Sequence, residues 1–238
     1  MKTIGLLGGM SWESTTSYYR LLNEETRSRL GGLHSACLCL YSLDFQPLET
    51  MQHEGDWDGI TDVLVSGAER VAAAGAEMLL LCTNTMHKVA PQLEAALEIP
   101  LLHIADATAQ QLQADGITRV GLLGTRFTME EAFYRTRVED RFDIEVLVPP
   151  EPQRKEVHRI IYEELCQGHI VEDSRHRLLA IVAQLSAAGA QGVILGCTEI
   201  ALLIQQAHTE VKLYDSTTLH CQAALNQAIA GDPTPSTT

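Results

Sequence analysis

Two short polar segments of the sequence contain side chains that can transfer protons. Cys197 begins the segment 197–199, Cys-Thr-Glu, and Thr83 begins the segment 83–85, Thr-Asn-Thr. Each segment follows an apolar run typical of a buried strand and precedes a stretch with helical periodicity. A thiolate is an effective base, and a helix N-terminus lowers the pKa of a cysteine. Two such groups on opposite sides of one carbon would remove a proton from one face and return one to the other, which inverts a stereocentre.

The elements that must position these segments alternate between strand and helix along the chain. Such alternation is typical of α/β architecture with mainly parallel sheets. In these sheets ligands bind at the carboxyl ends of the strands, where helix N-termini begin. The expected strands are residues 3–7, 35–44 and 78–82, and the expected helices run from an N-cap at Ser11 to Arg29, over 60–74, and over 86–97 before Pro100.

An internal repeat relates the two polar segments. Residues 74–85 align without gaps with residues 188–199, so that Thr83 corresponds to Cys197. One such match could be chance, and a lone buried cysteine is more often a small apolar side chain than a base. Three further matches in the same order favour a duplication: 4–8 with 120–124, 18–20 with 133–135, and 103–106 with 212–215.

The repeat predicts an α/β fold with two pseudo-symmetric lobes, each a mainly parallel sheet flanked by helices. We expect the active site in the cleft between the lobes, where equivalent strand ends would face each other. The helix after Asp215 is expected to return to the first lobe. The predicted boundaries are 1–106 plus 215–231 for the first lobe, 107–214 for the second, and 232–238 for a loose tail.

The charge balance excludes some classes of partner. Lys and Arg number 17 against 31 Asp and Glu, a formal net charge of −14. This argues against nucleic acid and against an anionic membrane surface, because both require a basic face. A carboxylate substrate could still be bound by backbone amides at helix N-termini. The six cysteines include no Cys-x-x-Cys pair and no signal peptide is recognisable, so we expect a reduced, cytoplasmic protein.

Three motifs together are similar to those of a known enzyme family. They are Gly-Gly-Met-Ser-Trp-Glu-Ser-Thr at 8–15, Cys-Thr-Asn-Thr-Met-His at 82–87 and Gly-Cys-Thr-Glu at 196–199. Over nearly its whole length the sequence resembles the aspartate/glutamate racemases, above all their enterobacterial broad-specificity amino-acid branch, the L-aspartate/D-glutamate racemases. The resemblance implies racemisation by a base and an acid with no cofactor, neither pyridoxal phosphate nor metal, in a chain that forms homodimers.

The sequence departs from this family at the first catalytic position. The usual motif is Cys-Asn-Thr, whereas Thr83 stands here in place of the cysteine. Cys82 lies one residue too early, and on a strand a shift of one residue turns the side chain to the other face. We therefore assign Thr83 and Cys197 as the catalytic pair. A threonine hydroxyl seldom acts as a base, so the resemblance to glutamate racemases implies that Cys197 deprotonates the L-amino acid and Thr83 reprotonates the other face.

Several polar residues are candidates for substrate binding. Those in the catalytic segments offer donors to an α-carboxylate or simply cap the following helices. Gln52 stands near a basic residue of some relatives, and Glu164 stands where others have lysine, which favours relaxed side-chain selectivity; Glu164 could equally lie on a solvated helix face. The candidates are Met10, Gln52, Asn84, Thr85, Glu164 and Thr198.

Other motifs carry less information. His87 follows Thr83 by four residues and either orients the catalytic segment or merely packs at a helix start. The histidines lack the spacing of metal ligands. The run Gly5-x-x-Gly8-Gly9 is not a dinucleotide-binding loop.

Two alternatives to an amino-acid racemase stay open. Hydantoin racemases, maleate isomerases and arylmalonate decarboxylases share the paired strand-end residues. An amino-acid sensor that binds without turnover would also tolerate loss of the first catalytic cysteine.

Overall fold

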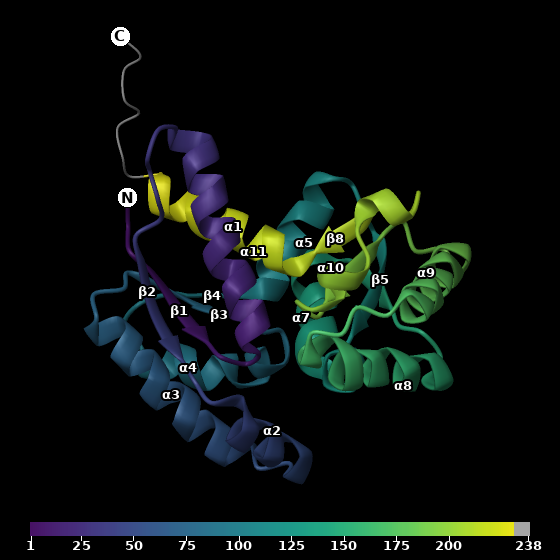
Figure 1. Cartoon of the computed structure of the whole chain (residues 1–238), viewed down its shortest axis with the longest axis horizontal. Coiled ribbons are helices and arrows are strands. Elements are labelled where there is room, and N and C mark those ends of the chain that lie inside the picture. The colour runs from purple at the N-terminus through teal and green to yellow at the C-terminus, as the bar shows by residue number, and fades with distance from the viewer. Residues whose placement is uncertain (231–238) are drawn as a thin grey trace. The chain divides into compact units, whose positions relative to one another are not determined.

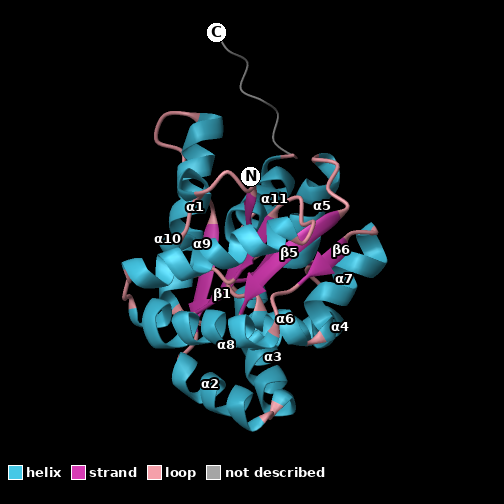
Figure 2. Ribbon diagram, turned by 90° about the vertical axis from the view of Figure 1, so that its right-hand side faces the viewer, coloured by secondary structure: helices cyan, strands magenta, loops and turns pink. Residues whose placement is uncertain are grey.

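The chain forms two compact units, and the computed structural model describes residues 1–230 (Figure 1). Within the described residues, unit 1 consists of residues 1–82, 89–102 and 220–230, and unit 2 consists of residues 83–88 and 103–219. Each unit is an α/β structure with a parallel sheet flanked by helices, which confirms the predicted fold class (Figure 2). Within the described residues, no helix has both the length and the apolar character that a membrane span needs.

Unit 1 contains a four-stranded parallel sheet with the order β2-β1-β3-β4. The two central strands are buried along their whole length, as expected for a parallel sheet covered on both faces. The strands are β1 (Ile4–Gly8), β2 (Leu38–Ser42), β3 (Met78–Leu81) and β4 (Leu101–Leu102). The helices are α1 (Trp12–Leu30), α2 (Phe45–Glu54), α3 (Trp57–Ala73), α4 (Ala90–Ala96) and most of α11 (Ser216–Ile229).

Unit 2 contains a second four-stranded parallel sheet with the order β6-β5-β7-β8. Its strands are β5 (Arg119–Gly124), β6 (Glu145–Leu147), β7 (Val193–Gly196) and β8 (Leu213–Asp215). The α-helices are α5 (Ile104–Ala114), α6 (Arg126–Glu130), α7 (Ala132–Phe142), α8 (Glu151–Arg159), α9 (Glu172–Ala187) and α10 (Ile200–Leu203). Shorter turns are η2 (Ile160–Glu164), which is π-helical, and the 3-10 turns η1 (Thr85–Val89), η3 (Leu165–Gln167) and η4 (Gln206–His208).

The register of the two sheets reproduces the sequence repeat. Leu7 of β1 pairs with Leu81 of β3, and Leu123 of β5 pairs with Leu195 of β7. Two residues beyond Leu81 is Thr83, and two residues beyond Leu195 is Cys197. The two positions are therefore equivalent in topology as well as in sequence.

The first helix begins where the sequence predicts. Ser11 is the N-cap of α1, and its side chain accepts a hydrogen bond from the backbone N–H of Ser14. The predicted helix over 86–97 is instead the 3-10 turn η1 followed by α4. Pro91 causes the break, because it lies in the first turn of α4 and has no N–H to donate to the carbonyl of the preceding turn.

The C-terminal helix α11 belongs to unit 1 from residue 220 onward. Cys221, Ala224, Leu225 and Ala228 are buried in one apolar cluster with residues of β1, β3 and α1. The segment 83–88 groups with unit 2, whereas the sequence had placed it within the first lobe. The expected tail, 232–238, lies outside the described residues.

Candidate active site

The residue before Thr83 is enclosed in the core of unit 1. Cys82 is fully buried, its backbone N–H donates to the carbonyl of Leu7, and its carbonyl accepts from Ser14 Oγ at 2.8 Å. Burial raises the pKa of the Cys82 thiol well above its usual range. The thiol of Cys82 is therefore protonated and held among apolar side chains, and Thr83, 8% exposed, follows where β3 has ended.

Asn84 is linked by hydrogen bonds to the strand that carries Cys197. The Ser216 hydroxyl donates to the carbonyl of Leu195 at 2.8 Å, and Asn84 Nδ2 donates to Ser216 Oγ at 3.2 Å. A hydroxyl has one proton, so Ser216 must accept from Asn84, which fixes the orientation of the Asn84 amide. Asn84 Oδ1 is then left buried without a hydrogen-bond partner. This oxygen is therefore an unused acceptor, on a side chain that is connected to β7 by two hydrogen bonds through Ser216.

Thr85 is part of a buried cluster of three hydroxyl groups. Its Oγ1 lies 3.1 Å from Thr125 Oγ1 and 3.4 Å from Thr128 Oγ1, and the latter two are 3.2 Å apart. Thr125 follows Gly124, the last residue of β5, which pairs with Gly196 directly before Cys197. Segment 83–85 therefore lies at the carboxyl edge of the second sheet, where Cys197 also lies. Neither Thr125 nor Thr128 is among the residues predicted from the sequence to bind substrate.

Cys197 donates a hydrogen bond to a buried carboxylate. Its Sγ lies 2.9 Å from Oε2 of Glu199, which is 4% exposed. From the sequence alone, Glu199 is the last residue of the Cys-Thr-Glu motif and has no predicted role. A carboxylate two residues after a strand-end cysteine is the signal that could have identified it, because a proton-transferring group needs an adjacent acceptor.

The surroundings of Cys197 favour the protonated form of its thiol. Burial is the main cause that raises the pKa of this thiol, followed by the negative charge of Glu199 and a smaller effect of Cys166 in η3. A protonated thiol beside a carboxylate is a donor–acceptor pair through which one proton can move. The pair can therefore supply a thiolate at the moment when the proton passes to Glu199.

The Thr198 hydroxyl donates a hydrogen bond to the same carboxylate. Its Oγ1 donates to Glu199 Oε2 at 2.7 Å. The expected side-chain donation from Thr198 to a substrate carboxylate would need this proton, so only the backbone N–H of Thr198 is suited to that role. The hydroxyl instead helps to fix the Glu199 carboxylate.

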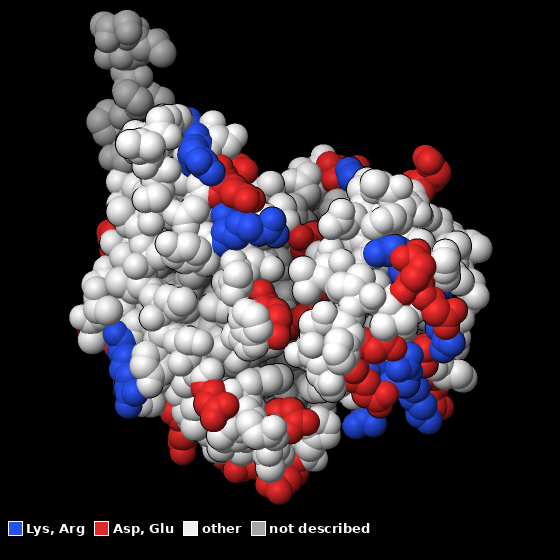
Figure 3. Space-filling view, in the orientation of Figure 1, with Lys and Arg blue, Asp and Glu red and all other residues white. Residues whose placement is uncertain are grey.

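Glu164 lies at the end of the π-helical turn η2, and π-helical turns are frequent at functional sites. Its Oε1 accepts from Arg159 Nη1 at 2.9 Å, whereas its Oε2 is buried and has no hydrogen-bond partner. The side chain is only 13% exposed, so Glu164 does not lie on a solvated helix face. Arg159 also binds Glu156 of α8, within the mixed acidic and basic surface that Figure 3 shows along α8 and α9.

Two predicted substrate-binding residues belong to unit 1. Met10 follows β1 and is 4% exposed, and Gln52 of α2 is 2% exposed. The other predicted residues belong to unit 2: Thr83, Asn84, Thr85, Glu164, Cys197 and Thr198.

No group of three or more His, Cys, Asp or Glu side chains in residues 1–230 is arranged to hold a metal ion. None of the six cysteines, all of which lie in this part of the chain, forms a disulfide bond.

Comparison with known proteins gives a consistent result. The family model described as Asp/Glu/Hydantoin racemase matches residues 7–224. Among curated proteins, the broad specificity amino-acid racemase RacX of Bacillus subtilis strain 168 is 20% identical over 232 residues, which are 95% of this chain and 98% of that protein.

Two solved structures are similar in sequence as well as in fold. A candidate Asp/Glu racemase from Yersinia pestis is 51% identical, with a TM-score of 0.89 over 96% of this chain and 100% of that chain. An aspartate racemase homologue from Pyrococcus horikoshii OT3 is 34% identical, with a TM-score of 0.84 over 96% of this chain and 99% of that chain.

Proposed function

Because this chain belongs to the Asp/Glu/hydantoin racemase family, we propose that it inverts the α-carbon of an amino acid by proton transfer between Cys197 and Thr83, without a cofactor. The family and the racemase relatives make the protein an isomerase. The observation that supports the proposed mechanism is the Cys197 thiol hydrogen-bonded to buried Glu199 at the end of β7. Thr83 occupies the equivalent position after β3.

The proposed reaction consists of two proton transfers. Glu199 takes the proton of the Cys197 thiol, and the thiolate removes the α-proton of the L-enantiomer. The electron pair of the broken C–H bond delocalises into the α-carboxylate. The Thr83 hydroxyl then delivers a proton to the opposite face. The proton held by Glu199 passes through water to the Thr83 alkoxide, which restores both groups for the next turnover. A threonine is a poor base, so we expect the reverse direction to be slower per bound substrate.

Polar groups beside the catalytic pair suit the two charged ends of an amino acid. Asn84 Oδ1 is a buried acceptor without a partner, which suits an ammonium group. The backbone N–H groups of Thr85 and Thr198 suit the α-carboxylate. The hydroxyl cluster around Thr85 holds that segment in place.

We propose a broad range of amino-acid substrates rather than strict selectivity for dicarboxylates. The supporting observation is Glu164, which keeps one buried carboxylate oxygen unpartnered and offers an acceptor where other family members offer a cation. Gln52, a neutral amide, is proposed to contact the side chain, and Met10 is proposed to contact the substrate. The Bacillus subtilis relative is named a broad specificity amino-acid racemase, which agrees with this choice.

The experiment that tests the function is α-proton exchange in deuterated water across a panel of L-amino acids. Inversion with deuterium at the α-carbon of the D-product is the expected result for at least one amino acid. Binding of an amino acid without α-deuteration would instead establish a sensor, the alternative that the missing first cysteine favours. Turnover of a hydantoin or of a malonate derivative alone would reassign the protein within the wider family.

The cellular setting is also a proposal. We place the protein in the cytoplasm as a homodimer that acts on a free amino acid. Two large apolar side chains of α1, Trp12 at 67% and Tyr19 at 55%, are exposed and would suit a subunit contact.

A further inference from the structure

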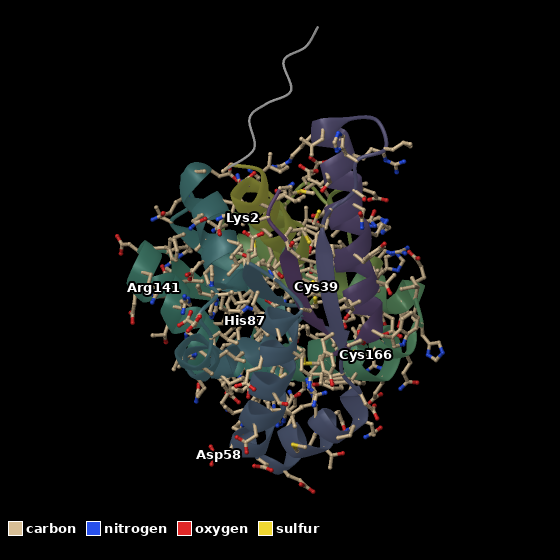
Figure 4. The ribbon with its side chains drawn as sticks, turned by 90° about the vertical axis from the view of Figure 1, so that its left-hand side faces the viewer. Lys2, Cys39, Asp58, His87, Arg141 and Cys166 are labelled. Carbon is tan, nitrogen blue, oxygen red and sulfur yellow. The ribbon has the colours of Figure 1, made fainter. Side chains whose placement is uncertain are left out.

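His87 is buried in unit 2 and connects Thr83 to the start of α5. Its Nδ1 lies 2.8 Å from the carbonyl oxygen of Thr83, and its Nε2 lies 3.2 Å from the backbone nitrogen of Ile104. The side chain is 1% exposed. Figure 4 shows His87 surrounded by other side chains, whereas Asp58 and Arg141 lie at the edge. The imidazole thus touches the backbone of one proposed catalytic residue directly.

The two hydrogen bonds fix the tautomer of His87. The backbone N–H of Ile104 can only donate, so Nε2 must be the unprotonated nitrogen. In the neutral ring the proton then resides on Nδ1, which donates it to the carbonyl of Thr83. Both nitrogens of the ring are accounted for, and a second proton on the ring would oppose the N–H of Ile104.

A second histidine supports the ring from α5. His103 is the N-cap of this helix, and its Nδ1 accepts from the N–H of Ala105 at 3.2 Å. The ring centroids of His87 and His103 are 4.5 Å apart. The backbone N–H of His87 donates in turn to the carbonyl of Asn84 at 3.1 Å. Segment 83–87 is therefore bound at its first and second residues by groups of His87.

From this arrangement we propose that His87 is a positioning residue, whose Nδ1–H holds the backbone of Thr83 so that its hydroxyl reaches the α-carbon. The inference rests on the proposed function, in which Thr83 delivers the second proton. Of the two roles that the sequence left open for His87, orienting the catalytic segment or merely packing at a helix start, the proposal favours the first. Displacement of a reacting group by about 1 Å can cost on the order of 10²-fold in rate, so one backbone hydrogen bond at this position has a large effect.

Two substitutions separate the two hydrogen bonds of the ring. Asparagine places an amide nitrogen near the position of Nδ1, so His87→Asn keeps the donor to Thr83 and loses the acceptor for Ile104. Glutamine places its oxygen near the position of Nε2, so His87→Gln keeps the acceptor and loses the donor. If His87 positions Thr83, H87N retains inversion and H87Q loses it; if His87 only anchors α5, the order is reversed and the proposal is overturned.

The readout is a ratio, which a general loss of folded enzyme does not change. An L-amino acid is incubated in deuterated water, and α-deuterium is measured in the D-product and in the recovered L-substrate. Loss of Thr83 positioning leaves deprotonation by Cys197 intact, so H87Q should shift the ratio from product toward recovered substrate by about 10²-fold. A ratio equal to that of the unmodified enzyme would overturn the proposal.

Two controls keep the inference separate from the proposed function. Thr83→Ala should show the same shift toward recovered substrate; if T83A still inverts normally, the assignment of Thr83 has failed, whatever His87 does. Long-range proton–nitrogen NMR of the histidine rings reads the tautomer of His87 without any substrate. A proton on Nδ1 is expected, and a proton on Nε2 alone would contradict the positioning role.

Discussion

The ends of β3 and β7 are equivalent in the repeat, yet the cysteine that follows each strand has very different neighbours. Cys82 lies directly after β3 and is surrounded by apolar side chains and backbone groups. Cys197 lies directly after β7 and donates to the carboxylate of Glu199. Burial raises the pKa of both thiols. The two buried thiols therefore differ in their surroundings: apolar side chains and backbone groups enclose Cys82, whereas a carboxylate that can accept the proton lies beside Cys197. The proposed mechanism depends on this difference.

The same substitution at the two cysteines should have very different effects. Cys197→Ala removes the proposed base and should lower turnover by about 10³-fold or more, since general acid–base catalysis contributes up to about 10⁴-fold. Cys82→Ala is the matched control and should leave turnover nearly unchanged while lowering stability. Steady-state racemisation and denaturant unfolding measure the two effects. Equal turnover for both variants would remove Cys197 from the mechanism.

Glu199→Gln should lower turnover by about 10²-fold, because the amide cannot take the thiol proton. The same change removes the negative charge that raises the pKa of Cys197. Alkylation of Cys197 at a fixed pH should therefore become faster while racemisation becomes slower. Glu163→Gln, at an exposed side chain of η2, is the control and should alter neither rate. Slower alkylation in E199Q would show that the carboxylate does not act on the thiol as argued.

A buried histidine of unit 1 gives that unit its own pH dependence. His220 Nδ1 accepts from the Tyr18 hydroxyl at 2.8 Å, and Nε2–H donates to the carbonyl of Leu102 at 2.9 Å. Burial lowers the pKa of His220 to about 4, from 6.5 in an unfolded chain. The unfolded state therefore binds this proton first as the pH falls, and stability present above pH 6.5 is lost progressively down to about pH 4.

At pH 5 this loss amounts to about 2 kcal/mol relative to pH 7. His220→Gln should be less stable at pH 7 but should show less change between pH 7 and pH 5, as measured by the free energy of unfolding in urea. An unchanged slope in H220Q would mean that other groups cause the acid sensitivity.

Thr83→Cys would make the two strand ends alike in chemistry. A thiol is a far better base than a hydroxyl, so α-proton exchange of the D-enantiomer should rise by about tenfold or more. The double variant Cys82→Ala/Thr83→Cys should behave in the same way, which excludes a contribution from the neighbouring thiol. Exchange of the D-enantiomer that stays at the original rate would count against Thr83 as the second catalytic position.

Much of the fold could be predicted because its signals are local. Apolar runs mark the buried strands, Ser11 marks the start of α1, and the repeat predicts two sheets with one strand order. The prediction of one helix over 86–97 was wrong, because Pro91 lies in the first turn of a new helix, α4, which follows the turn η1. Of the proposed site, the residues within the two contiguous motifs around Thr83 and Cys197 could be predicted from the sequence, but their contacts with distant residues could not. Asn84 and Ser216 are 132 residues apart, and no spacing rule connects them.

The sequence by itself determined the α/β fold, the equivalence of Thr83 and Cys197, and membership of a racemase family, because periodicity, internal repeats and contiguous motifs are properties of the chain. The tertiary structure alone decided the hydrogen bonds. It gave the Thr198 proton to Glu199, left Asn84 Oδ1 without a partner, and set the tautomer of His87. The physical reason is that a buried donor or acceptor must find a partner in three dimensions, and folding brings that partner from distant positions in the chain.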